Sequence, residues 1–292
     1  MDIPKIVLSS FCFKETNLIK LFDFILKNNL EGIELSANIN YLDYSRLYDL
    51  INNHINKIGI YIHNYFPRPV RDFVLNLGHP YTIKDSIEHI RYAVDLCSEL
   101  GIAHYSFHAG MALNPSSEDL GKLQSYLTPI DFRESRKLLF VNCLELADYA
   151  QKKQVELSIE NNVVSCLNCP DGINDRYHLA DARDFPYFNE LFKHPNLSML
   201  LDIGHLKVSA NTLNFNSFSF IRSFIENIKV IHLSENDGKT DQNLPIKSDS
   251  WFWNFIPWKQ VEYVSLEVSK QPFDILLDQL ALIKQKIVDH FG

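Results

Sequence analysis

The sequence predicts an α/β protein that folds as a (β/α)8 TIM barrel, a single domain over residues 1–292. Three observations support this prediction. Eight short apolar runs alternate with helix-like segments or loops, no change of composition marks a linker, and six of the eight runs end in His, Asp or Glu. Strands that alternate with helices in this way are typical of a parallel sheet covered by helices.

The predicted elements follow one another in a regular order. Strands are expected at residues 5–9, 32–36, 58–63, 104–108, 155–160, 197–202, 228–232 and 263–267. Helices are expected near 15–28, 44–56, 82–100, 131–153, 217–227 and 273–290. The longest loop, residues 161–180, is rich in Cys, Asn, Pro, Asp and Gly. A doubly wound open sheet is the alternative, but no glycine-rich phosphate-binding turn follows the first strand.

Alternation within the strands predicts where their terminal side chains point. In the fifth strand Leu157 and Ile159 fall on one face, and Ser158 and Glu160 fall on the other. The strands around His108, His232 and Glu267 follow the same pattern. Because side chains of a barrel strand point alternately inward and toward the helices, the terminal residues are expected to point inward. They then lie at the C-terminal ends of the strands, where barrel active sites lie.

Four of these strand-end residues are predicted to hold a divalent metal: Glu160, Asp202, His232 and Glu267. Three carboxylates and an imidazole brought together need a cation to offset their repulsion. Such a donor set suits Mn²⁺, Zn²⁺, Mg²⁺, Co²⁺ or Fe²⁺, and residue type alone does not choose among them. The competing interpretation, four satisfied polar residues at a barrel mouth, is weakened by their matching alternation.

Composition limits the classes of partner and the compartment. The chain has 28 basic and 36 acidic residues, a net charge of −8, which disfavours a general nucleic-acid-binding role. The N-terminus lacks the pattern of a signal peptide, and no apolar stretch is long enough to span a membrane. Five cysteines are typical of reduced thiols, so a cytoplasmic location is expected. The oligomeric state stays open, a homo-oligomer included.

Two stretches in the second half of the chain carry a family resemblance. Leu201-Asp-Ile-Gly-His205 contains an Asp-x-Gly-His motif, and His232–Pro245 is a polar loop that ends in Leu-Pro. Ile159-Glu-Asn161 and Leu266-Glu267 add to them. Together these motifs resemble the xylose-isomerase-like barrel superfamily, which contains sugar phosphate isomerases and epimerases and, more distantly, endonuclease IV.

The resemblance implies a metal-dependent isomerase or epimerase of carbohydrate metabolism, acting on a sugar or sugar phosphate. In such enzymes four strand-end residues, here Glu160, Asp202, His232 and Glu267, hold one metal that polarises a carbonyl and a hydroxyl. The two glutamates then move a proton next to the carbonyl as acid and base. His205 would contact the substrate and orient or polarise its oxygen. The alternative for His205 is a cap-like residue on the following helix.

Endonuclease IV supplies the alternative function, a metal-dependent phosphodiesterase acting on abasic DNA. His63 and His108 fit two of its additional ligand positions and imply a second metal site. Asp241, with His205, fits a third position. The partner expected beside Asp241 is Asn243 here, and asparagine is a poor zinc ligand. This departure and the net charge of −8 favour the isomerase.

Further residues are weaker candidates. Arg68 and Arg71 follow the third strand, where they are placed to meet a phosphate or carboxylate of a substrate. Glu34 faces inward and is expected to be the hydrogen-bond partner of His63. The aromatic residues of 251–258 are expected either to stack on a sugar ring or to form an apolar cluster under a loop.

Overall fold

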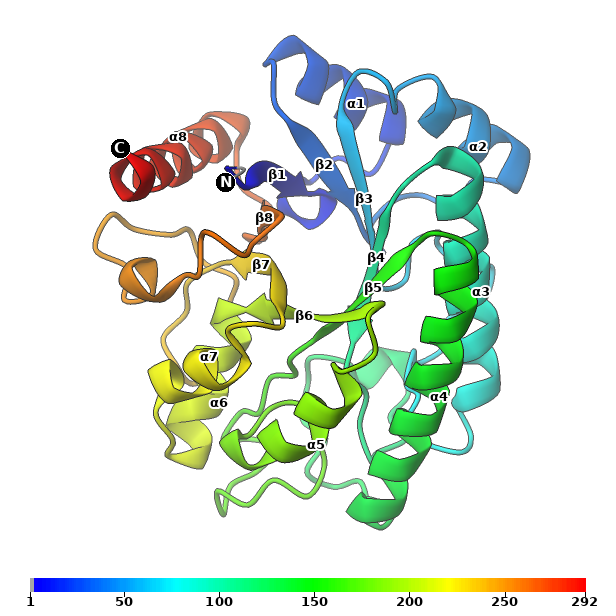
Figure 1. The fold of residues 1–292 in the computed structure, drawn as a ribbon, viewed down its shortest axis with the longest axis vertical. Coiled ribbons are helices and arrows are strands. Elements are labelled where there is room, and N and C mark those ends of the chain that lie inside the picture. The colour runs from blue at the N-terminus through cyan, green and yellow to red at the C-terminus, as the bar shows by residue number, and fades with distance from the viewer. Residues whose placement is uncertain (1–2) are drawn as a thin grey trace.

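Eight parallel strands close into a barrel in the order β1 to β8, and each strand pairs with its neighbours in sequence. The computed structural model describes residues 3–292. The helices form a ring outside the strands (Figure 1). The prediction of a (β/α)8 TIM barrel is therefore confirmed. The strands are β1 Lys5–Ser9, β2 Gly32–Leu35, β3 Gly59–His63, β4 His104–His108, β5 Glu156–Glu160, β6 Leu197–Asp202, β7 Ile228–Leu233 and β8 Tyr263–Leu266.

The helices match the six predicted segments and add two that the sequence pattern did not reveal, α5 and α6. They are α1 Leu18–Lys27, α2 Tyr44–Asn52, α3 Ile83–Leu100, α4 Phe132–Lys152, α5 Phe185–Leu191, α6 Ile203–Leu213, α7 Ser217–Phe224 and α8 Phe273–Phe291. Helix α6 begins directly after β6, and most of its side chains are buried. A helix that is buried on most sides has no polar face, so its periodicity is weak.

The core around the strands consists of two layers. Most buried apolar side chains pack between the outer face of the strands and the helices. A second, smaller cluster comprises Val7, Leu200, Val230 and Tyr263. These residues belong to β1, β6, β7 and β8, and Val7 and Val230 share the inward face of their strands with Ser9 and His232. This inner layer supports the polar residues at the strand ends.

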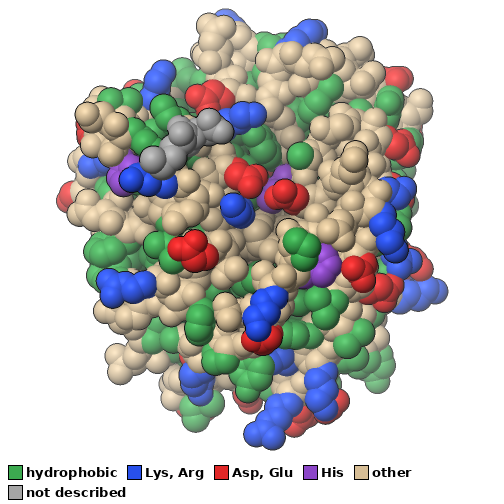
Figure 2. Space-filling model, in the orientation of Figure 1, with side chains coloured by type: hydrophobic (Ala, Val, Ile, Leu, Met, Phe, Trp, Pro, Cys, Tyr) green, Lys and Arg blue, Asp and Glu red, His purple; other side chains and the backbone are tan. Residues whose placement is uncertain are grey.

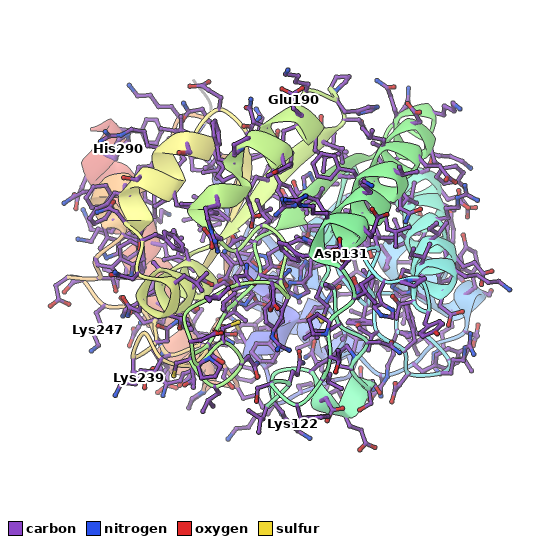
Figure 3. All side chains as sticks on the ribbon, turned by 90° about the horizontal axis from the view of Figure 1, so that it is seen from below. Lys122, Asp131, Glu190, Lys239, Lys247 and His290 are labelled. Atoms are coloured by element: carbon purple, nitrogen blue, oxygen red, sulfur yellow. The ribbon has the colours of Figure 1, made fainter. Side chains whose placement is uncertain are left out.

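The register between strands places the terminal side chains at one level. On β4 and β5, His104 pairs with Glu156 and His108 pairs with Glu160. On β6 and β7, Asp202 pairs with His232. Figure 3 shows Lys122 and Lys239, in the loops after β4 and β7, on the opposite side of the molecule from Glu190 and His290. The loops on the Lys122 side cover the C-terminal ends of the strands.

Two expectations from composition can be compared with the structure. Among residues 3–292, no helix is both long and apolar enough to cross a membrane. All five cysteines are free thiols.

Candidate metal centre

The barrel brings Glu160, Asp202, His232 and Glu267 together, as the sequence predicts. One ligand atom from each lies within 4.8 Å of the others. The first three are fully buried. His232 Nδ1 lies 2.7 Å from Glu267 Oε2 and 3.9 Å from both Glu160 Oε1 and Asp202 Oδ2. This imidazole nitrogen therefore lies among the three carboxylates.

The oxygens of this cluster lack ordinary partners. Within the described residues, neither carboxylate oxygen of Glu160 makes a hydrogen bond, and Asp202 Oδ2 makes none either. A buried polar atom without a partner costs about 1–3 kcal/mol, and a buried charge costs more. The pKa of Glu160 is raised well above its usual value, first by burial and also by the Asp202 and Glu267 carboxylates, although His205 and His232 oppose the shift. The donor atoms and their unmet demand fit a divalent cation.

Glu34 sets the orientation of His232 by contacting the ring nitrogen that faces away from the cluster. Glu34 Oε1 lies 2.9 Å from His232 Nε2, and both side chains are fully buried. Tyr263 OH and Ser265 Oγ donate to the same carboxylate at 3.1 and 3.0 Å. Burial raises the pKa of Glu34, but His232 more than offsets this effect and lowers the pKa to about 2. An ionised Glu34 keeps the Nε2 proton on His232, so Nδ1, which faces the cluster, is the nitrogen that would bind a cation once its own proton is displaced.

The expected pairing of Glu34 with His63 is wrong. His63 Nδ1 instead contacts Ser106 Oγ at 3.0 Å. Ser106 lies on β4 next to His63, because the two residues pair in register. The Ser106 hydroxyl on the adjacent strand, and not the Glu34 carboxylate, is therefore the hydrogen-bond partner of His63.

A second group of donors shares Glu160 with the first. His63 Nε2 lies 3.3 Å from Glu160 Oε2, and His108 Nδ1 lies 3.2 Å from the same oxygen. Ligand atoms of these three residues lie within 4.8 Å of one another. His63 is buried, whereas the side chain of His108 is 32% exposed. Glu160 thus lies between two potential metal positions.

His205 lies beside the first cluster and connects it to the loop after β7. Its Nδ1 donates to the Asn161 carbonyl at 2.8 Å, and its Nε2 lies 3.3 Å from Asp241 Oδ2. Burial lowers the pKa of His205, but Asp202 and Asp241 more than offset this and raise it well above its usual value. Asn243 Nδ2 donates to Asp241 Oδ2 at 3.2 Å. Asn243 therefore orients Asp241, a role its amide can perform without binding a metal.

The cap of helix α6 is Asp202, which excludes the alternative in which His205 is the capping residue. Asp202 Oδ1 accepts a hydrogen bond from the His205 backbone N at 2.6 Å. The Asn161 side chain also holds Asp202: its Oδ1 accepts from Asp202 N at 2.7 Å and its Nδ2 donates to Asp202 O at 3.1 Å. One carboxylate oxygen of Asp202 thus stabilises the helix, and Oδ2 faces the cluster.

A cavity of about 330 Å³ adjoins the centre. It is closed by parts of the loops after β3, β4 and β5, and no Lys or Arg of the described chain lines it. The lining residues are Asn64, Tyr65, Val74, Leu75, His108, Gly110, Met111, Leu120, Gly121, Gln124, Asn162, Val163, Asn168, Tyr177, His205 and Asp241. A volume of this size is at the lower end of small-molecule sites. Such a cavity has room for a small molecule.

Asn64 is a candidate site residue that the sequence argument missed. It directly follows His63, and its backbone φ of 51° places it in the left-handed region that asparagine tolerates. Its Oδ1 is buried without a hydrogen-bond partner among residues 3–292, although the residue lines the cavity. This oxygen is available to accept a hydrogen bond from a bound hydroxyl. The signal in the sequence was only an asparagine at a strand end.

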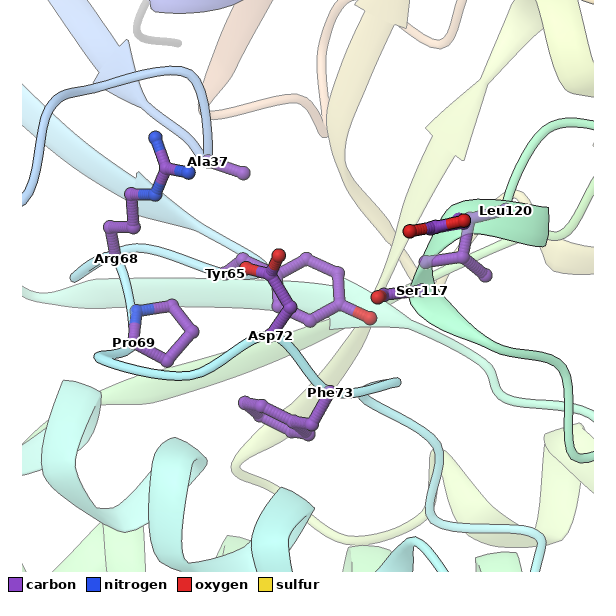
Figure 4. Close-up of a pocket in the computed structure, with 9 residues that line it drawn as sticks. Ala37, Tyr65, Arg68, Pro69, Asp72, Phe73, Ser117 and Leu120 are labelled. Atoms are coloured by element: carbon purple, nitrogen blue, oxygen red, sulfur yellow. The ribbon is translucent and has the colours of Figure 1, made fainter.

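A second, outer pocket of about 350 Å³ lies beside the first, and Tyr65 and Leu120 line both. Figure 4 shows Arg68 on one side of this pocket and Ser117 and Leu120 on the other. Arg68 therefore lines the outer pocket, not the cavity at the centre. Arg71 is 76% exposed and forms an ion pair with Asp85 at 2.7 Å, so it does not reach the cavity.

The aromatic residues of 251–258 belong to the main core. Phe252, Trp253 and Trp258 are buried there, and Trp253 Nε1 donates to the Lys247 carbonyl at 2.8 Å. None of them lines the cavity. Of the two expectations for this segment, packing under a loop is the one that agrees with these contacts.

Comparisons with known proteins agree with this architecture. The profile of a family described as "Xylose isomerase-like TIM barrel" matches residues 22–263. A D-tagatose 3-epimerase-like protein superposes with a TM-score of 0.69 at 18% identity, covering 97% of both chains. The 3-keto-D-glucoside 4-epimerase YcjR of E. coli superposes with a TM-score of 0.65 at 14% identity, covering 98% of this chain and 99% of that one. Endonuclease IV of Thermus thermophilus superposes with a TM-score of 0.61 at 12% identity, covering 98% of this chain and 100% of that one. No curated protein matches the chain.

Proposed function

The chain belongs to the xylose isomerase-like TIM barrel family, and from this premise we propose that it is a divalent-metal-dependent isomerase or epimerase of a sugar or related polyol. Proteins of like fold include sugar epimerases. One observation carries the proposal: a buried cluster of three carboxylates and one imidazole adjoins a small cavity that no described Lys or Arg lines. The free cysteines support a cytoplasmic location.

The composition of the cavity favours an unphosphorylated substrate. A phosphate group binds best to Arg, Lys or a series of backbone N–H groups. The cavity instead offers amides, two tyrosines, two histidines and one aspartate. These groups suit hydroxyl and carbonyl oxygens. The Asn64 oxygen, the Asn162 amide and Tyr177 surround the space in which a sugar would lie.

The proton transfer is assigned to Glu160 and Glu267. A cation held by Glu160, Asp202, His232 and Glu267 would supply Lewis acidity that polarises the substrate carbonyl and adjacent hydroxyl. One glutamate removes the proton from the carbon next to the carbonyl, and the other returns a proton. The Nε2 atom of His205 contacts and orients the substrate oxygen.

The test is exchange of a sugar C–H proton with deuterated solvent, followed by NMR in the presence of Mn²⁺, Co²⁺ or Zn²⁺. Glu267→Gln is expected to lower the exchange rate by about 10²-fold or more, since a positioned acid or base contributes about 10²–10⁴. Glu226→Gln, at an exposed surface position, is the matched control. Absence of exchange across a panel of ketoses and aldoses, in protein with bound metal, would contradict the proposal.

The group of His63, His108 and Glu160 favours a second candidate function, a metal-dependent phosphodiesterase acting on abasic DNA. Two ligand sets that share a carboxylate suit a two-metal hydrolytic site. The net charge of −8 opposes this candidate, as does a cavity lined by no Lys or Arg of residues 3–292. Nicking of a duplex with one abasic site, by protein that exchanges no sugar proton, would select it.

A further inference from the structure

A third group of potential ligands lies at the opposite end of the barrel from the proposed active site. His104 is the first residue of β4, and Glu156, its partner in register, is the first residue of β5. Glu262 directly precedes β8. Although β8 lies across the closed barrel from β4 and β5, one ligand atom from each residue lies within 4.8 Å of the others.

His104 lacks every partner that a buried imidazole normally has. Its exposure is 4%, and both ring nitrogens are buried without a hydrogen bond to any described residue. Its ring contacts the Tyr263 ring edge-on, with centroids 5.6 Å apart. Burial lowers the pKa of His104 to about 4, so the ring is neutral at neutral pH. A neutral imidazole with a free lone pair is the form that binds a metal.

The carboxylates of Glu156 and Glu262 lie near each other, and neither is paired with a basic side chain of the described residues. Partial burial raises the pKa of Glu262, and the charge of Glu156 raises it further, whereas Lys229 lowers it. Between residues 3 and 292, neither carboxylate forms an ion pair with a basic side chain within 4.0 Å. In the space-filling view, acidic side chains, a histidine and a basic side chain lie together near the middle of one face of the molecule (Figure 2).

We propose that His104, Glu156 and Glu262 bind a further divalent cation at the N-terminal end of the barrel. One nitrogen and two carboxylate oxygens suit Zn²⁺, with water completing its coordination, because both glutamates face solvent. The ion joins opposite walls of the barrel and binds only where the barrel is closed. It therefore stabilises the folded state in proportion to its occupancy.

This site is separate from the proposed catalytic centre. His104 and His108 lie on the same face of β4, four residues apart, so the two positions differ by about 13 Å along the strand. At that separation the two ions are resolved as distinct peaks in a diffraction map. The site also uses none of the residues assigned to proton transfer, so its loss leaves the proposed activity intact.

The test is anomalous diffraction at the zinc edge from crystals of the full chain equilibrated with ZnCl₂. A peak between His104 and the two glutamates is expected in the wild-type protein, and it disappears in His104→Phe. Protein with a zinc peak at Glu160 and none at His104 overturns the proposal, as does protein with no zinc peak anywhere. The peak at Glu160 depends on the proposed function, so the two proposals fail separately.

Zinc-dependent unfolding supplies the second measurement. Wild-type protein and His104→Phe are heated with EDTA and with excess ZnCl₂, and the zinc-induced rise in Tm is compared. The rise is expected to be smaller in His104→Phe, and Glu156→Gln should reproduce that loss. Equal rises in all three proteins would overturn the proposal. His104→Phe replaces an unpartnered polar ring with an apolar one, so it is expected to fold.

Discussion

At the scale of single residues, the centre depends on contacts that the strand-end pattern does not contain. Alternation correctly predicted that Glu160, Asp202, His232 and Glu267 meet, because each follows from the period of a strand. The partner of Glu34 could not be predicted in this way. Both His63 and His232 point into the barrel, and only the closed geometry places His232 within 2.9 Å of Glu34.

Glu34→Gln is expected to weaken divalent metal binding at the strand ends by about 10–100-fold, the usual effect of removing the partner of a histidine ligand. The amide cannot keep the charge that holds the proton on His232 Nε2, so Nδ1 is no longer presented reliably as a lone pair. The measurement is a titration of metal-free protein with Zn²⁺ against a chelator of known affinity. Glu226→Gln should bind as the wild-type protein does, and an unchanged affinity in Glu34→Gln would contradict the assigned role of Glu34.

At the scale of elements, the strands were easier to predict than the loops and buried helices. Five-residue apolar runs with alternating faces give strands directly, whereas α6 directly follows the metal-type ligand Asp202 and contains Gly204. Its first turn lies beside the polar cluster, so burial on most sides weakens the helical pattern. The cavity walls come from loops without periodicity. Asn64, Gln124 and Tyr177 therefore gave no signal of their role.

The loop after β5 is attached to the barrel through His178, which makes its attachment dependent on pH. His178 Nε2 lies 2.7 Å from Ser135 Oγ, and its ring stacks on Phe132 with centroids 4.5 Å apart. Burial lowers the pKa of His178 from 6.5 to about 3, and the charge of Arg136 acts in the same direction. The folded state therefore requires the neutral ring. The contribution of neutral His178 to the free energy of unfolding is complete above pH 6.5, and it is lost as the pH falls toward 3.

His178→Gln is expected to flatten the acid side of the stability profile. One pKa unit corresponds to about 1.4 kcal/mol, so His178 accounts for about 3 kcal/mol of the stability lost between about pH 6.5 and 4. Glutamine keeps an N–H donor for Ser135 but does not titrate. The measurement is the free energy of unfolding in urea at pH 7.5, 6.0, 5.0 and 4.0. Parallel profiles for the two proteins would show that His178 is not the titrating group.

At the scale of the whole molecule, charge separates the two candidate functions more sharply than the metal ligands do. The ligand groups are compatible with an isomerase and with a hydrolase, because both reactions use carboxylate and imidazole donors. The net charge of −8 disfavours a polyanionic substrate. The cavity, which no Lys or Arg of the described residues lines, disfavours it too. Binding of DNA releases counterions from its phosphates, whereas binding of a neutral sugar releases none.

Ionic strength is therefore expected to have little effect on the reaction of this protein. Between 50 and 200 mM KCl, kcat/KM for an uncharged sugar should change less than about twofold. An enzyme that contacts 6–10 phosphates would lose about 10³–10⁵ in affinity over the same range. The measurement is the initial rate of sugar proton exchange at several salt concentrations, with the metal concentration held constant. A steep decrease with salt would show that the substrate is a polyanion, and it would favour the phosphodiesterase even if the four strand-end ligands bind a metal as proposed.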